Sequence, residues 1–276
     1  TLLYLIFINI ILAESWNLIG GYGGQISLGI GAFFGVGAYT SVILINAGLT
    51  PFLSVPLGGI MAVGLAIVTT PTFKLRGVYF AIGTLFLPEI IKVVVLTWRS
   101  VTGGAAGIFM PIQAKFTAIP YYLSSFFLVM FVLLFTHIIA NSKVGIALRA
   151  IREEEEAAET LGVNAIKFKF IAYACCAFFV GLSGGIHSFY LLMLFPQSTF
   201  YIMWSVGPVF MSIIGGVGTL AGPIVGAIIF TFLSQVLVMV PIIGEIHLFV
   251  LGSLLIGIIL LMPGGIVGTA KKILKL

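Results

Sequence analysis

Long apolar stretches make up most of the chain, and short polar or glycine-rich segments separate them. Each stretch is close to the roughly 20 residues that an α-helix needs to cross a bilayer. The pattern therefore predicts an all-α polytopic membrane protein with eight or nine spans, forming one transmembrane domain over 1–276. The predicted spans are 1–19, 26–46, 51–72, 78–98, 117–140, 166–192, 203–219, 222–240 and 246–262.

The segment 141–169 breaks this apolar pattern, because it holds five of the eight acidic residues and five of the thirteen Lys and Arg. A 3.6-residue period predicts one short amphipathic helix there, ended by Gly162 and supported by the pairs Arg149–Glu153 and Arg152–Glu156. The segment 143–164 would offer a docking face outside the membrane. The apolar stripe of this helix consists of Ala147, Ala150, Ile151, Ala157, Ala158 and Leu161.

Composition and charge agree with a membrane protein and orient it. Hydrophobic residues are 61% of the chain and charged residues 8%, with a mean hydropathy of +1.26. Placing the loop 141–165 in the cytoplasm leaves ten Lys and Arg inside and three near the outer side, as the positive-inside rule requires. We therefore expect a cytoplasmic C-terminus. Because this orientation starts the chain outside, we also expect a longer N-terminus before Thr1.

Two glycine-rich breaks, 20–29 and 215–223, interrupt the apolar stretches, and both contain the pattern GGxG. Non-helical backbone survives at membrane depth where protein or a water-filled cavity satisfies it. Such breaks are the best sequence pointer to a translocation path, with close helix packing or a tight cytoplasmic turn as the alternative. The predicted path residues are Gly23, Gln25, Ser27, Gly29, Gly215, Gly216, Gly218 and Thr219.

Few residues inside the spans could carry chemistry. Glu89 and Lys92 lie three residues apart on one helix and can neutralise each other. The remaining acids, Glu14 and Glu245, are near span ends, where water should reach them. The same interfacial setting is expected for His137, His187 and His247, and Cys175 and Cys176 should pack in the core. No catalytic arrangement, metal-binding spacing or ATP-binding motif is visible, so we expect no enzyme activity and no cofactor in this chain.

Several blocks are similar to a known family in the same order. They are WNLIGGYGGQISLG at 16–29, LRGVYFAI at 75–82, TGGAAGI at 102–108, the stretch 145–162, and GGVGTLAGP at 215–223. Together they resemble the branched-chain amino acid ABC-importer permeases, M-type subunit, over about residues 14–240. The family pattern has Gly-His where this chain has Gly29-Ile30, so we assign no polar substrate contact to Ile30.

The resemblance gives the charged helix a role. The pattern EAAxxxG at Glu156–Gly162 is similar to the loop that ABC-importer permeases insert into their ATPase subunit. The implied coupling residues are Ala147, Ala150, Ile151, Glu156, Ala157, Ala158, Leu161 and Gly162.

The resemblance also implies a bacterial or archaeal cytoplasmic (inner) membrane, which the chain crosses several times, and several partners. They are two cytoplasmic ABC ATPases that bind ATP-Mg, a second homologous permease subunit that forms a heterodimer, and an extracytoplasmic solute-binding protein.

The resemblance implies inward transport of branched-chain amino acids, and other functions stay open. A urea or short-amide permease of the same family would look alike, because nothing in the apolar spans separates the cargoes. A proton- or sodium-driven secondary transporter would need midspan acids, which are scarce here. An intramembrane enzyme has no candidate residues. Scattered basic residues do not form the exposed face that nucleic-acid binding needs.

Overall fold

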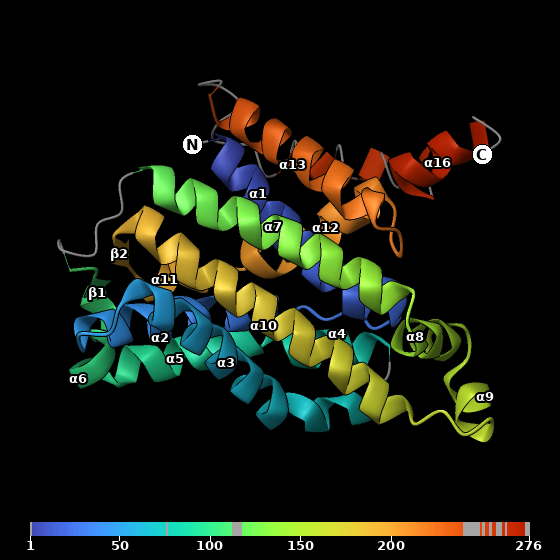
Figure 1. Cartoon of the computed structure of the whole chain (residues 1–276), viewed down its shortest axis with the longest axis horizontal. Coiled ribbons are helices and arrows are strands. Elements are labelled where there is room, and N and C mark those ends of the chain that lie inside the picture. Colours follow the sequence, from blue (N-terminus) through green and yellow to red (C-terminus); the bar gives the residue numbers. More distant parts are fainter. Residues whose placement is uncertain are drawn as a thin grey trace.

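A computed structural model describes residues 2–75, 77–111, 118–239, 249, 252–253, 256–257, 261–262 and 264–273. Figure 1 shows helices running side by side, with α8 and α9 at one end and β1, β2 and α6 at the other. The elements are α1 (Leu2–Trp16), η1 (Asn17–Tyr22), α2 (Ile30–Asn46), α3 (Pro51–Thr69), η2 (Thr70–Lys74), α4 (Val78–Leu85), α5 (Leu87–Thr97), α6 (Arg99–Thr102), η3 (Gly104–Ala106), β1 (Ile108–Phe109), α7 (Ala118–Ala140), α8 (Lys143–Glu153), α9 (Glu155–Thr160), α10 (Ala165–Leu191), β2 (Met193–Leu194), α11 (Pro196–Thr199), α12 (Met203–Gly215), α13 (Ala221–Met239) and α16 (Gly265–Ile273).

Eight of the nine predicted spans coincide with helical segments, which confirms an all-α membrane protein. Two segments are apolar but shorter than a span, namely α2 and the Ala221–Leu237 part of α13. The ninth predicted span, 246–262, lies almost wholly outside the described residues. Within the described residues, six segments are long and apolar enough to cross a membrane. They are Leu2–Tyr22, Pro51–Lys74, Val78–Thr97, Pro120–Ala140, Ala165–Leu191 and Pro196–Gly215.

Glycine and proline explain where the helices depart from the predicted boundaries. The chain is non-helical from Gly24 to Gly29, and Gly24 has a φ of +70°, so α2 begins at Ile30 rather than near residue 26. The span 78–97 is divided at Phe86 into α4 and α5. Pro88 accounts for this break, because it has no N–H to donate to the carbonyl of Thr84 four residues earlier.

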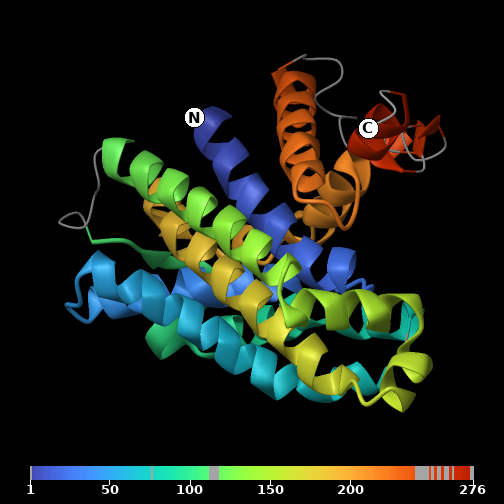
Figure 2. The ribbon, with the colours of Figure 1, turned by 45° about the vertical axis from the view of Figure 1, so that its right-hand side comes forward.

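The helices form two groups around α1. On one side, α10 packs against α2 and α3, while α1 contacts α7, α10, α12 and α13. Figure 2 shows α13 and α16 on the far side of α1 from α2 and α3. The short strands β1 and β2 pair antiparallel, with Ile108 opposite Leu194, at the end of the bundle away from α8. This pairing is the one feature that an all-α prediction did not include.

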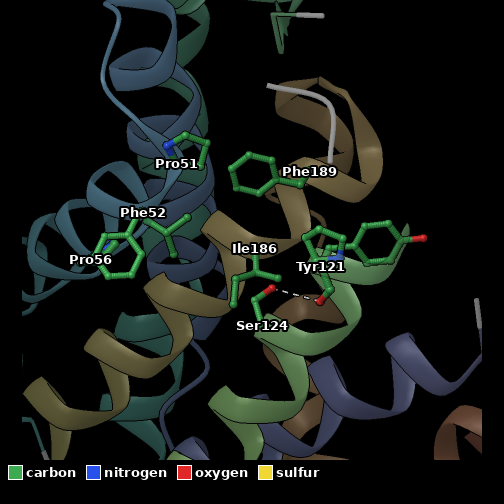
Figure 3. A pocket seen from close by; sticks show the side chains of 9 residues that line it. Pro51, Phe52, Pro56, Tyr121, Ser124, Ile186 and Phe189 are labelled. Carbon is green, nitrogen blue, oxygen red and sulfur yellow. Dashed lines mark hydrogen bonds between the residues drawn. The ribbon is translucent and has the colours of Figure 1, made fainter. Parts of the chain in front are cut away.

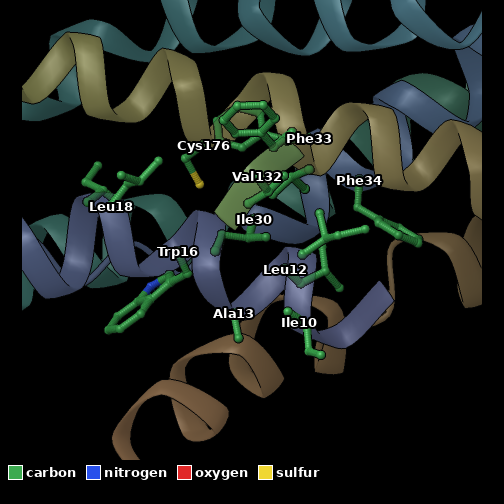
Figure 4. Close-up of a cluster of buried hydrophobic side chains, with 14 of the residues drawn as sticks. Ile10, Leu12, Ala13, Trp16, Leu18, Ile30, Phe33, Phe34, Val132 and Cys176 are labelled. Carbon is green, nitrogen blue, oxygen red and sulfur yellow. The ribbon is translucent and has the colours of Figure 1, made fainter. Parts of the chain in front are cut away.

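Buried residues of α1 and η1 form the centre of the core. Leu12, Trp16 and Leu18 belong to one buried cluster with Ile30 and Phe33 of α2 and Cys176 of α10, as Figure 4 shows. The indole Nε1 of Trp16 donates to the carbonyl oxygen of Ser27 at 2.9 Å, so the largest core side chain also satisfies the non-helical segment that follows it. The core and the first glycine break therefore depend on each other.

Small residues allow the closest helix contacts. A β-carbon added to Gly37 of α2 would overlap the carbonyl oxygen of Gly181 of α10. One added to Gly58 of α3 would lie 2.6 Å from the carbonyl oxygen of Gly37. The backbones of α2, α3 and α10 thus approach as closely as glycine allows, which is how membrane helices gain packing without a hydrophobic driving force between them.

Two polar residues lie deeper than the sequence indicated. The expectation that water reaches Glu14 is wrong, because its side chain is fully buried and neither carboxylate oxygen has a hydrogen-bond partner. The helix does not end near residue 19 but continues through η1, which moves Glu14 inward. The ring of His187 is buried as well, with Nδ1 3.1 Å from the hydroxyl of Tyr4. His137 is exposed near Asn141, as expected, and His247 lies outside the described residues.

The glycine contacts lead to a stability prediction. We expect Gly37→Ala to destabilise the protein by about 1–3 kcal/mol, because α2 and α10 must separate to admit the methyl group. The melting temperature of the purified protein in detergent measures this. Gly64→Ala is the matched control, since a β-carbon at Gly64 meets nothing within 4 Å. Equal melting temperatures for the two variants would contradict the packing described for α2 and α10.

Candidate functional site

The charged segment forms two helices rather than the one predicted. Ser142 begins α8 by accepting a hydrogen bond from the amide of Val144 at 3.1 Å. The helix stops at Glu154, whose φ of −157° and ψ of 108° are extended, and α9 starts at Glu155. Glu155 forms an ion pair of 2.6 Å with Lys169, whose side chain is 3% exposed. A buried ammonium needs a partner, and the break at Glu154 allows Glu155 to provide it.

The predicted coupling residues divide into a buried and an exposed set. Ala147 and Ile151 of α8 face the bundle, and Ala158 of α9 packs with Ile151 and Ala165. The single apolar stripe is therefore wrong, because the bend at Glu154 turns α9 relative to α8. Gly162 has a φ of +89°, in the left-handed region expected at a helix end. The exposed members are Ala150, Glu156, Ala157, Leu161 and Gly162.

The two glycine breaks lie against each other, although about 200 residues separate them. The side-chain Nδ2 of Asn17 donates to the carbonyl oxygen of Thr219 at 2.9 Å. The amide of Gly218 donates back to Asn17 Oδ1 at 2.8 Å. A β-carbon on Gly21 would lie 2.8 Å from the same amide. One asparagine therefore satisfies backbone groups that the second break leaves without helical partners.

Arg152 connects α8 to both breaks. Its Nη1 donates to the carbonyl oxygen of Gly21 at 2.6 Å. The same nitrogen would be 2.7 Å from a β-carbon on Gly218, and Cγ would be 2.8 Å from one on Gly24. The predicted coupling segment and the predicted translocation path are thus in direct contact through one guanidinium. We call this contact of Arg152, Asn17, Gly21 and Gly218 the cytoplasmic junction, after the predicted position of α8.

The other residues predicted for the path extend from the junction. Gln25 is half-buried, and its Oε1 has no hydrogen-bond partner. Ser27 is buried, and its hydroxyl accepts a long hydrogen bond of 3.4 Å from the amide of Gly29. A β-carbon on Gly29 would lie 3.0 Å from the carbonyl oxygen of Thr84, so the break reaches the α4–α5 region. Gly23 is buried near Leu148 of α8.

The second break is a tight turn between α12 and α13. Gly215 lies so close to Gly222 that no side chain fits between them. The hydroxyl of Thr219 donates to Gly216 at 2.9 Å and accepts from the amide of Gly222 at 3.0 Å, which caps the start of α13. A β-carbon on Gly265, the first residue of α16, would lie 2.5 Å from the amide nitrogen of Gly216. The helix α16 therefore begins against the second break.

An apolar cavity of about 370 Å³ lies at the opposite end of the bundle, between α3, α7 and α10. Figure 3 shows Phe52, Tyr121, Ile186 and Phe189 around it, with the hydroxyl of Ser124 donating to the carbonyl oxygen of Tyr121 at 3.1 Å. None of its lining residues is charged. Free amino acids carry two charges, so this cavity does not suit them as a binding site.

Sequence reasoning missed three residues of this arrangement. Asn17 and Lys169 were not singled out, and Arg152 was placed in a pair within its own helix. The partners of two of them are distant in the chain: 131 residues separate Arg152 from Gly21, and 202 residues separate Asn17 from Thr219. The available signal was an asparagine directly before a glycine-rich break, where unpaired backbone groups need a side-chain partner.

Comparisons with known proteins agree over most of the chain. The profile of the family described as "Branched-chain amino acid transport system / permease component" matches residues 1–259. The chain is 27% identical over 303 residues to the high-affinity branched-chain amino acid transport system permease protein LivM of Escherichia coli, covering 99% of this chain and 70% of the relative. For the same protein of Salmonella typhimurium the identity is 26% over 300 residues, covering 98% and 70%.

A probable branched-chain amino acid transport permease protein LivM of Methanocaldococcus jannaschii is 25% identical over 177 residues. That match covers 62% of this chain and 51% of the relative. No solved structure matches the chain.

The Glu155–Lys169 ion pair provides a test of how α9 is held. Removing one partner of a fully buried ion pair lowers the free energy of unfolding by about 3–5 kcal/mol. The loss should be smaller for this pair, because the Glu155 side chain is 26% exposed to solvent, which screens the charges. We expect Glu155→Gln to lower the melting temperature, and the double variant Glu155→Gln with Lys169→Met to recover most of the loss. Glu154→Gln, on the exposed neighbour, is the control. A melting temperature unchanged by Glu155→Gln would show that the pair does not stabilise the fold.

Proposed function

The chain belongs to the family of branched-chain amino acid transport system permease components, and we propose that it is the permease subunit of an ATP-driven importer of small amino acids. The expected cargo is leucine, isoleucine or valine. The proposed assembly contains a second homologous permease subunit, two cytoplasmic ABC ATPases that bind ATP-Mg, and an extracytoplasmic solute-binding protein. The assembly would lie in a bacterial or archaeal inner membrane, with α8, α9 and the C-terminus in the cytoplasm.

The contact of Arg152 with Gly21 is the observation that carries this proposal. In this reading the ATPases dock on the exposed residues of α9, while the buried face of α8 stays attached to the bundle. Arg152 then links any displacement of α8 to the end of η1 and to both glycine breaks, where residues 24–29 and 216–220 are non-helical. Rearranging such segments requires fewer broken hydrogen bonds than bending a continuous helix.

The alternatives differ in cargo or in energy source. The printed names of all three relatives refer to branched-chain amino acids, which favours that cargo over urea or a short amide. A binding assay on the partner solute-binding protein decides between these cargoes. Uptake that continues without the ATPases and stops with an uncoupler would instead identify a secondary transporter.

The docking role of α9 leads to a mutational prediction. Ala157 and Leu161 are exposed, and Leu161 is 85% exposed, whereas Ala158 is buried and its replacement would disturb the fold. We expect Ala157→Glu with Leu161→Glu to abolish leucine uptake and leucine-stimulated ATP hydrolysis in the reconstituted complex, with normal membrane insertion. Ala157→Ser with Leu161→Met adds no charge and changes side-chain size only slightly, so it should stay active. Normal uptake by the double-Glu variant would rule out docking at this surface.

Arg152 gives a second prediction. We expect Arg152→Gln to lower the leucine transported per ATP hydrolysed by about tenfold, because the shorter neutral side chain no longer connects α8 to Gly21. Uptake and ATP hydrolysis measured on the same proteoliposomes give this ratio. Arg149→Gln, three residues earlier on the same helix, removes an exposed charge and should leave the ratio within twofold. If both variants transport the same amount of leucine per ATP hydrolysed, the junction does not take part in coupling.

A further inference from the structure

The span formed by α4 and α5 carries two opposite charges near its middle. Glu89 lies in the first turn of α5, and its carboxylate forms an ion pair with the ammonium of Lys92. The side chain of Glu89 is 54% exposed and that of Lys92 23% exposed. The apolar segment that contains them extends from Val78 to Thr97. By its position in this segment the pair lies at membrane depth, on a surface that the other described residues leave partly open.

Lipid is a poor cover for this surface. An ionised side chain at the centre of a membrane helix costs about 2.5–3.5 kcal/mol on insertion scales, and such residues almost always face protein or a water-filled cavity. This span is also the least buried of the six, with 28% of its residues buried inside the chain. By contrast, the exposed middle of α7 presents Phe127, Met130 and Phe131, which suit lipid tails. Protein or water therefore suits the charged side of α5 better than lipid, and the other described residues leave that side partly open.

A second observation points to the same surface. The break between α4 and α5 adjoins the first glycine break, because the amide of Leu28 donates to the hydroxyl of Thr84 at 3.0 Å. Pro88 leaves the carbonyl of Thr84 without its usual helical donor. Two interrupted helices therefore meet one turn from Glu89. Interrupted helices at membrane depth are found where protein buries them or where they line a water-filled cavity, and transporter binding sites are commonly built from them.

We propose that the Glu89–Lys92 pair lines the cargo path between this chain and the second permease subunit, and that it contacts zwitterionic amino acids. The carboxylate of Glu89 would take the α-ammonium of the cargo, and the ammonium of Lys92 its α-carboxylate. Exchange of the internal ion pair for two pairs with the cargo keeps the charge balance at zero throughout. This inference rests on the proposed transport function.

Cysteine labelling of the complete transporter in membrane vesicles tests the proposal. The background carries Cys175→Ala and Cys176→Ala, which removes both native cysteines of this chain. Into it we introduce Val93→Cys; Val93 lies one turn from Glu89 on the same face of α5, and its side chain is 58% exposed. A charged, membrane-impermeant methanethiosulfonate reagent should modify Val93→Cys, and leucine should slow the modification at least fivefold. Met130→Cys on α7, where the native residue is 53% exposed, is the matched control and should not react.

The charges themselves are tested in the same assay. We expect Glu89→Gln and Lys92→Gln each to raise the leucine concentration for half-maximal protection of Val93→Cys about tenfold. Ile91→Val, which removes one methyl group between them, should change it less than twofold. If neither substitution changes the leucine concentration needed for protection, the pair does not contact the cargo.

Failure of this proposal is distinguishable from failure of the transport function. Leucine uptake by the cysteine-free background reports the transport function alone. If uptake occurs and Val93→Cys either stays unmodified or reacts no faster than Met130→Cys, the surface does not line the path. If the background shows no ATP-dependent uptake, the proposed function itself fails.

Discussion

The cytoplasmic junction depends on the need of an interrupted membrane helix for hydrogen-bond partners. Where a helix stops at membrane depth, its free N–H and C=O groups cannot turn to lipid, and each unsatisfied group costs several kcal/mol. Asn17 satisfies an amide and a carbonyl of the second break, and Arg152 satisfies a carbonyl of the first. Satisfying these groups forces α1, α8 and the turn between α12 and α13 into one place. The charged segment is thus part of the bundle and not an independent appendage.

The first glycine break also connects this junction with the charged pair of α5. Its backbone passes from Gly21, at the Arg152 contact, to Leu28, at the hydroxyl of Thr84. The indole of Trp16 also donates to the carbonyl oxygen of Ser27, so side chains from three different elements bind this segment. The segment from the end of η1 to Leu28 therefore touches the elements proposed for ATPase coupling and for cargo contact.

Local patterns predicted the parts of the fold that depend on local physics. Hydropathy located eight helical segments, Gly162 ended α9 in the left-handed region, and the spacing of Glu89 and Lys92 anticipated their ion pair. The break at Glu154 was not predictable in this way, since the ion-pair partner that it allows Glu155 to reach, Lys169, lies on another helix. The burial of Glu14 and His187 likewise depends on which helices cover them. The coupling and path residues could be proposed from sequence, but their contact through Arg152 could not.

The hydrogen bonds of Asn17 have a consequence for biogenesis. Its partner Thr219 follows 202 residues later, so at translation rates of about 5–20 residues per second the nascent helix waits roughly 10–40 s for it. During that time the amide must be hydrated or sheltered by the insertion machinery, because hydrocarbon offers it no donor or acceptor. The emergence of the second glycine break, rather than that of α1, therefore sets the earliest moment at which the two halves of this permease can close on each other.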